Sequence, residues 1–80
     1  MKPLSPEEER KIIDALTAAG NGWASSWQVT FDIIRGQCAC SAEEAVQIFD
    51  DFYFTRKLIV FVRQFENSPF FSYKWKRAEP

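Results

Sequence analysis

The side chains best suited to chemistry in this chain are two cysteines, Cys38 and Cys40, separated by a single residue. Thiolates bind zinc, but a four-ligand zinc site needs two further strong ligands, and the sequence has no histidine and no third cysteine. A disulfide between residues this close would close a strained ring. We therefore expect two reduced thiols, the state kept in the cytoplasm, and no bound metal.

Asp50 and Asp51 are adjacent carboxylates, a residue type that serves in general acid–base catalysis. On a helix their side chains diverge by about 100° around the axis, so they do not converge on one bond. The sequence also lacks a histidine base and a glycine-rich phosphate loop. We therefore expect no enzyme activity and no cofactor. The two aspartates then form a solvated face, a docking surface, or ion pairs with Arg35 or Lys57.

Basic residues are interspersed with aromatic ones in the last third of the sequence. Such surfaces bind phosphate backbones and stack on bases. The residues that would contact nucleic acid on this hypothesis are Arg56, Lys57, Arg63, Lys74 and Lys76. The alternative is a structural role, because lysines on an edge strand discourage aggregation.

Charge is distributed unevenly along the chain. Residues 1–51 contain four cations and nine acids, whereas residues 52–80 contain six cations and two acids. The net charge of −1 is the sum of an acidic first part and a basic last part. This asymmetry predicts a surface with one acidic and one basic face. The acidic part would suit a protein partner with a basic surface.

Three helices and a β-hairpin are predicted to position these residues. Apolar residues at helical spacing predict helices over residues 6–19, 26–35 and 42–56, with a minimal strand at Trp23-Ala24. Ser5 with Glu8, Ser41 with Glu44, and Ser25 with Gln28 have the spacing of helix caps. The predicted core residues of the helices are Ile12, Ile13, Leu16, Ala19, Trp27, Phe31, Ile34, Ala45, Ile48, Phe49 and Phe52.

After residue 57 the hydrophobic period changes from 3.6 towards 2, which predicts a hairpin. The predicted strands cover residues 58–65 and 70–76, joined by a turn at Glu66–Pro69. This turn sets Val62 opposite Tyr73 and Val60 opposite Trp75, and all four would face the helices. The residues expected on the opposite face are Phe61, Arg63, Phe65, Phe70, Ser72 and Lys74.

This order of elements resembles the winged helix-turn-helix superfamily across residues 5–76, an α+β fold in a single domain with loose ends at 1–4 and 77–80. In that superfamily the third helix enters the DNA major groove and the hairpin wing contacts phosphates or the minor groove. The resemblance places the groove-facing positions at Glu43, Val46, Gln47, Asp50 and Phe54. Gln47 suits base reading, but the acids repel phosphates.

We therefore expect a binding module, a protein–protein adaptor or inhibitor, with an unidentified and basic protein as its partner. The residues predicted to bind protein are Glu43, Gln47, Asp50, Asp51, Phe61, Phe65 and Phe70. The alternative is a DNA-binding transcriptional regulator that docks through the basic hairpin. Exposed aromatics are compatible with a homodimer, and the small size and acidity also fit an inhibitor encoded by a mobile element.

No apolar run approaches the roughly 20 residues of a membrane helix, and the acidic N-terminus is unlike a signal peptide, so we expect a cytoplasmic protein without a membrane partner.

Overall fold

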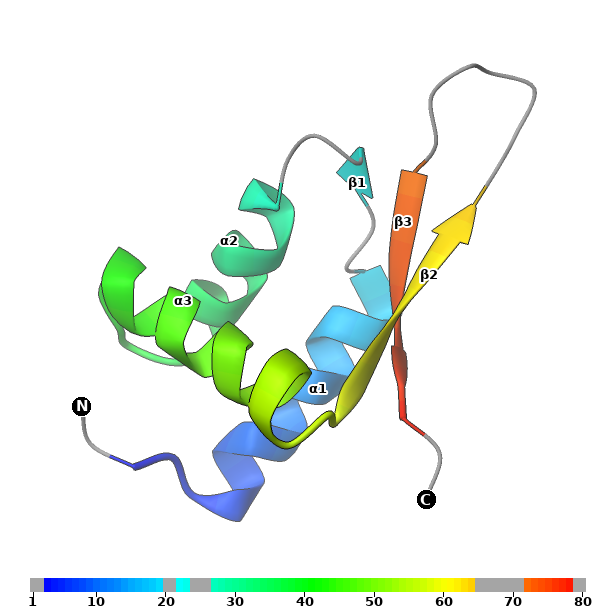
Figure 1. Cartoon of the computed structure of the whole chain (residues 1–80). Coiled ribbons are helices and arrows are strands. Elements are labelled where there is room, and N and C mark those ends of the chain that lie inside the picture. The colour runs from blue at the N-terminus through cyan, green and yellow to red at the C-terminus, as the bar shows by residue number, and fades with distance from the viewer. Residues whose placement is uncertain (1–2, 20–21, 24–26, 65–71, 79–80) are drawn as a thin grey trace.

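The computed structural model of the chain has three α-helices followed by an antiparallel β-hairpin (Figure 1). The structure describes residues 3–19, 22–23, 27–64 and 72–78. The elements are α1 (Pro6–Ala19), β1 (Gly22–Trp23), α2 (Gln28–Gln37), α3 (Ala42–Asp50), the π-helical turn η1 (Asp51–Thr55), β2 (Ile59–Gln64) and β3 (Ser72–Arg77). The predicted α+β fold class is confirmed. No helix in the described part of the chain is long and apolar enough to cross a membrane.

The predicted caps at Ser5 and Ser41 are both present. Ser5 and Glu8 exchange backbone–side-chain hydrogen bonds of 3.1 Å each, and Ser41 and Glu44 do the same at 3.0 and 3.1 Å. These bonds satisfy amides that the first turn of a helix leaves without partners. The hydrogen bonds from Ser41 lower the pKa of the Glu44 carboxyl. Residues close to each helix start therefore determine where α1 and α3 begin.

Helix α2 departs from its prediction at both ends. It begins at Gln28, two residues later than predicted, with Trp27 as the N-cap and no side-chain hydrogen bond to the cap. The predicted cap by Ser25 falls outside the described residues. It also continues through Gly36 to Gln37, where a turn was expected. Gly36 is exposed, and a Cβ added to it would meet no atom within 4 Å. A glycine inside a helix costs only about 1 kcal/mol relative to alanine, so it does not have to end the helix. The shift leaves Trp27 on the connection into α2, facing the sheet and not inside a regular turn.

The third predicted helix changes its winding halfway along. It is α-helical to Asp50 and then widens into η1, where the Arg56 amide donates to the Asp51 carbonyl at 2.8 Å. The Leu58 amide donates to the Phe52 carbonyl at 2.7 Å and closes the end. Lys57 between them has a φ of 54°, the left-handed conformation in which helices commonly stop. This wider turn is rare and often found at functional sites.

The sheet has the order β1-β3-β2, and the helices lie together on one side of it (Figure 1). Phe61 pairs with Trp75 and Arg63 with Tyr73, so the predicted pairs Val62–Tyr73 and Val60–Trp75 are wrong by one residue. The tyrosine and the tryptophan face the helices as predicted. A slip of one residue turns every side chain of the partner strand to its other face.

The register error came from the assumed turn. The prediction closed the hairpin with four residues, whereas the last described pair is Gln64 with Ser72 and residues 65–71 connect them. An odd connection in place of an even one reverses the faces of β2. Val60 and Val62 therefore lie on the outer face, beside Lys76 and Lys74. The predicted turn at 66–69 and the predicted Phe65–Phe70 pair fall outside the described residues.

The core lies between the helices and the inner face of the sheet. Its largest fully buried side chains are Ile12, Leu16, Thr30, Ile34, Phe52, Ile59, Tyr73 and Trp75. Thr30 is the polar member: its hydroxyl accepts the Trp75 indole Nε1–H at 2.8 Å and shares a hydrogen bond of 3.2 Å with the Tyr73 hydroxyl. Within the described part, no buried side-chain nitrogen or oxygen lacks a partner. One threonine thus joins α2 to the two aromatic residues of β3.

Candidate binding groove

An apolar groove with a volume of about 630 Å³ opens between α2, α3, η1 and β2. We call it the aromatic groove, because six aromatic side chains line it: Trp27, Phe31, Phe49, Tyr53, Phe54 and Phe61. Val46, Asp50 and Arg63 complete its walls. Its volume lies within the range of about 300–1,000 Å³ that clefts for small ligands occupy.

The floor of the aromatic groove is built around Trp27. Its ring stacks on Phe61 with centroids 5.7 Å apart and on Tyr73 with centroids 5.4 Å apart. Phe49 meets it edge-on at 5.1 Å. Aromatic pairs at such distances add about 0.5–1.5 kcal/mol each beyond the area they bury. The floor is therefore a continuous cluster of rings packed against one another.

The upper wall of the groove is exposed to solvent. The Phe54 ring is 64% exposed and touches Tyr53 and Phe49, with centroids 4.6 and 6.3 Å away. Val46, eight residues and so about two helical turns before it, is 40% exposed. Contiguous apolar surface of this kind typically marks an interaction site on a soluble domain.

Charged groups border the groove on two sides. Asp50 stands on the α3 side and Arg63 on the β2 side. The sequence prediction put Phe61 and Arg63 on the outer face of the hairpin, away from the helices, and the corrected register brings both into the groove. Sequence reasoning missed the groove because its walls come from residues far apart in the chain. The available signal was the surplus of rings, eight Phe with three Trp and two Tyr.

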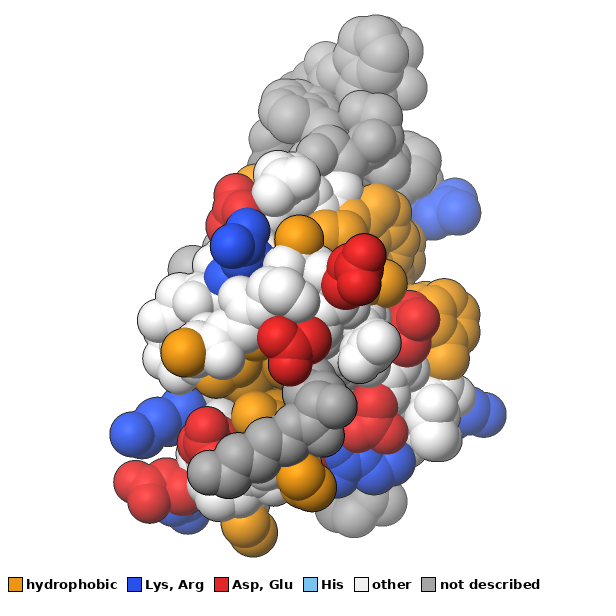
Figure 2. Space-filling model, turned by 90° about the vertical axis from the view of Figure 1, so that its left-hand side faces the viewer, with side chains coloured by type: hydrophobic (Ala, Val, Ile, Leu, Met, Phe, Trp, Pro, Cys, Tyr) orange, Lys and Arg blue, Asp and Glu red, His pale blue; other side chains and the backbone are white. Residues whose placement is uncertain are grey.

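The remaining residues of the predicted acidic surface lie along α3. Glu43 and Gln47 are exposed, as is Asp50. Figure 2 shows acidic side chains across the middle of this side of the molecule, with apolar side chains beside them towards its right-hand edge. Phe65 and Phe70, also predicted to bind protein, fall outside the described residues. The structure therefore places Asp50 where the acidic surface and the aromatic groove meet.

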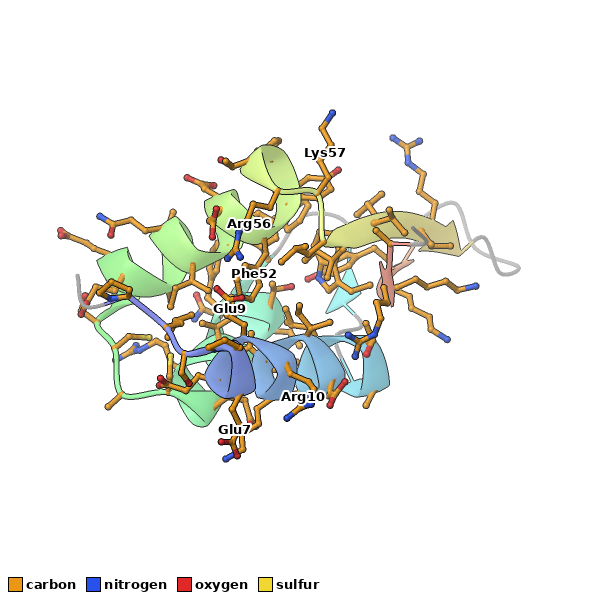
Figure 3. All side chains as sticks on the ribbon, turned by 90° about the horizontal axis from the view of Figure 1, so that it is seen from below. Glu7, Glu9, Arg10, Phe52, Arg56 and Lys57 are labelled. Carbon is orange, nitrogen blue, oxygen red and sulfur yellow. The ribbon has the colours of Figure 1, made fainter. Side chains whose placement is uncertain are left out.

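Asp51 belongs to a different arrangement from its neighbour. The Arg56 guanidinium donates to Asp51 Oδ2 at 2.9 Å through Nε and to Glu9 Oε1 at 2.8 Å through Nη2, and it lies 5.4 Å above the centre of the Phe52 ring (Figure 3). Hydrogen bonds from Arg56 to Glu9 and then to Asp51 raise the pKa of the guanidinium.

The partner of Asp51 corrects the expected pairing. The sequence predicted an ion pair with Arg35 or Lys57, whereas the structure pairs Asp51 with Arg56. Five residues apart on an α-helix, the two side chains would point well away from each other, but the wider η1 turn brings them to the same side. The network ties the end of η1 to α1 through Glu9.

The cations proposed to contact nucleic acid do not share a surface. Arg56 is engaged in the network just described, and Lys57 points away from it (Figure 3). Arg63 lies at the aromatic groove on the helix side of the sheet. Lys74 and Lys76 pair with Val62 and Val60 and so lie on the opposite face.

The cysteine pair lies in the connection between α2 and α3. The two sulfur atoms are 3.6 Å apart and unbonded, and the Cys38 thiol also reaches the Ile34 carbonyl at 3.5 Å. Burial and the hydrogen bond to Cys40 raise the pKa of the Cys38 thiol to about 11. No group of three or more metal-binding side chains occurs among the residues that the structure describes. The Cys38 thiol is therefore a poorly activated nucleophile, since the thiolate is the reactive form.

The raised pKa predicts slow alkylation of Cys38. With iodoacetamide, the rate at Cys38 in the folded protein should keep rising about tenfold per pH unit from about pH 8 to about pH 10. In urea the rate should level off above about pH 9, because an unfolded thiol has a pKa near 8.5. Peptide fragmentation by mass spectrometry assigns the label to Cys38 or Cys40. Equal pH profiles in the two states would contradict the prediction.

The same shift has a consequence for stability. The folded chain holds the Cys38 proton more tightly than the unfolded chain, so the contribution to the free energy of unfolding is complete below about pH 8.5. It is lost as the pH rises towards about 11. Chemical denaturation at a series of alkaline pH values measures this decline.

Comparison with protein-family models, with curated proteins and with solved structures finds no match for this chain. Three helices followed by an antiparallel hairpin are compatible with a winged-helix-like layout. The function therefore has to be argued from the groove, the acidic surface and the sheet themselves.

Proposed function

We propose that this chain is a non-enzymatic protein-binding module, an adaptor or inhibitor, that receives apolar side chains of a partner in the aromatic groove. The observation that carries the proposal is the exposure of Phe54 and Val46 on the wall of a packed aromatic floor. Leaving apolar surface in water forgoes about 25 cal/mol for each Å² that a partner could cover. Interface centres are enriched in aromatic residues for this reason.

The rim charges define the partner further. Asp50 borders the groove, and Glu43 and Gln47 extend the polar surface along α3. A partner segment would therefore carry an apolar or aromatic anchor flanked by Lys or Arg on the α3 side. Arg63 adds a positive charge on the β2 side of the groove. Such rim charges set specificity and the rate of association more than the total affinity.

DNA binding through the hairpin has less support. The winged-helix resemblance favours it, and Gln47 is exposed at a position where that superfamily reads bases. However, acids flank Gln47 on α3, and the proposed basic residues lie on separate faces. Fluorescence anisotropy with a labelled duplex at about 50 and 200 mM salt separates the two functions. We expect no saturable binding at the lower concentration, where a basic surface would bind most tightly.

A displayed library of random peptides tests the protein-binding proposal directly. We expect selection for an apolar or aromatic residue next to a basic one, and Asp50→Lys should weaken the selected peptides about tenfold, or about 1.4 kcal/mol. Lys76→Ala is the matched control, because that residue lies on the outer face of the sheet. Failure to enrich any sequence, or equal binding to the Asp50→Lys variant, would refute the proposal.

A further inference from the structure

Strand β2 is an open edge of the sheet. The order β1-β3-β2 gives it a strand partner on one side, and in the described ranges nothing pairs with its other side. Edge strands expose a row of backbone donors and acceptors, and proteins usually blunt them with proline, bulges or several charges. Residues 59–64 contain no proline, pair with β3 without a bulge, and carry Arg63 as their single charge. Apart from Arg63, which points to the helix side, residues 59–64 carry none of these deterrents to pairing with another strand.

A second cavity follows this edge. It has a volume of about 440 Å³ and is lined by Tyr53, Phe54, Lys57, Ile59, Val60 and Phe61. Ile59 and Phe61 face the helices, whereas Val60 faces the other way and is 40% exposed. A cavity that touches three successive residues with alternating faces runs along the strand edge itself. The edge is therefore open to a strand that would fill the cavity.

We propose that the strand that occupies this edge is β2 of a second copy of the chain, paired antiparallel about a twofold axis. The axis stands perpendicular to the sheet and passes through the pair formed by Phe61 and its copy. Val60 of each copy then lies opposite Val62 of the other, and Ile59 opposite Arg63. The result is a continuous six-stranded sheet in the order β1-β3-β2-β2-β3-β1.

The charges and apolar side chains of β2 favour its own copy over a foreign strand. In this register Arg63 meets Ile59 and not another arginine, so no like charges oppose each other. The outer-face valines of the two copies form one apolar strip. Lys74 and Lys76 of the two copies are separated by three strand spacings, about 14 Å, which exceeds the screening length of about 10 Å at 0.1 M salt. An acidic extended peptide would place its charges on valines.

The pairing also fixes where the aromatic grooves lie. A twofold axis perpendicular to the sheet keeps the helices of both copies on the same side. The two aromatic grooves therefore open on one side of the dimer, which would double the surface offered to a partner. The edge cavity and the aromatic groove share Tyr53, Phe54 and Phe61, so dimerisation is measured without a bound peptide.

Sedimentation equilibrium of the full chain across a range of concentrations tests the pairing. The expected result is a species of twice the 9.3 kDa chain mass. Replacing Val60 and Val62 both by lysine places two lysines opposite each other at two points and should raise the dimer Kd at least tenfold. Val60→Lys with Val62→Glu places lysine opposite glutamate at the same points and should restore the dimer. Lys76→Ala, on the neighbouring strand, should leave the Kd unchanged.

The pair of double variants keeps the test independent of folding. Both change the same two outer-face positions, and circular dichroism checks that each retains the wild-type fold. A wild-type chain that stays monomeric at every concentration overturns the proposal, as does equal dimerisation of the two double variants. Neither valine lines the aromatic groove, so peptide binding measured on the same proteins reports separately on the proposed function.

Discussion

Replacing Thr30 by valine is expected to lower the free energy of unfolding by about 1–3 kcal/mol. Valine has nearly the shape of threonine but lacks the oxygen that accepts the Trp75 indole hydrogen at 2.8 Å and contacts the Tyr73 hydroxyl at 3.2 Å. All three side chains are fully buried, so water does not replace the lost partner. A buried polar group left without a hydrogen bond costs about 1–3 kcal/mol. For domains that are stable by about 5–15 kcal/mol, this is a large fraction.

Thr30→Ser is the matched control for this effect. Serine keeps the hydroxyl and loses one methyl group, which is worth about 1 kcal/mol when buried. Equilibrium denaturation in urea, monitored by tryptophan fluorescence and by circular dichroism, measures both variants on the same scale. If the valine variant is no less stable than the serine variant, then the hydroxyl is not the link that holds α2 to β3.

Local sequence signals predicted the helical part of this fold well. The exchange of hydrogen bonds between Ser41 and Glu44 depends on residues three apart, and the same holds for Ser5 and Glu8. The apolar spacing in α3 placed Ile48 and Phe49 in the core, where both are buried. Such features need no knowledge of the rest of the chain, because a helix satisfies its own backbone.

The sheet was harder to predict because its register depends on the number of residues in the connection between β2 and β3. Alternation identified both strands, and Tyr73 and Trp75 are buried as expected. The partners of these residues on β2 depend on the length of the connection, and an even count in place of an odd one put Phe61 and Arg63 on the wrong face. The valines of β2 lie in a continuous apolar run, so the sequence alone does not separate them from core residues. Their exposure follows from pairing alone.

The candidate site was predicted only in part for the same kind of reason. Asp50 and Asp51 look equivalent in the sequence, and a regular helix would treat them alike. The η1 turn separates them, since it brings Arg56 to Asp51 and leaves Asp50 at the groove. No periodicity in the sequence marks that change of winding. Substituting both residues together would therefore mix a loss of ion pairing with a change at the candidate interface.

Phe54→Ala should separate binding from stability most sharply. We expect the affinity for a groove-selected peptide to fall at least about 30-fold, the equivalent of about 2 kcal/mol, which is the size of an interface hot spot. The ring is 64% exposed in the isolated chain, so its removal should change the free energy of unfolding by less than about 1 kcal/mol. Peptide titration and denaturation of the same protein sample measure the two quantities.

Val29→Ala provides the comparison. Val29 is also an exposed apolar residue, 40% accessible, and it lies on α2 outside the aromatic groove. It should leave peptide affinity within about twofold of wild type, since surface changes away from a contact are worth less than about 0.5 kcal/mol. Equal losses in the two variants would mean that exposed apolar area in general, and not this groove, holds the peptide. A large loss for Phe54 alone would locate the binding energy on the wall where α3 passes into η1.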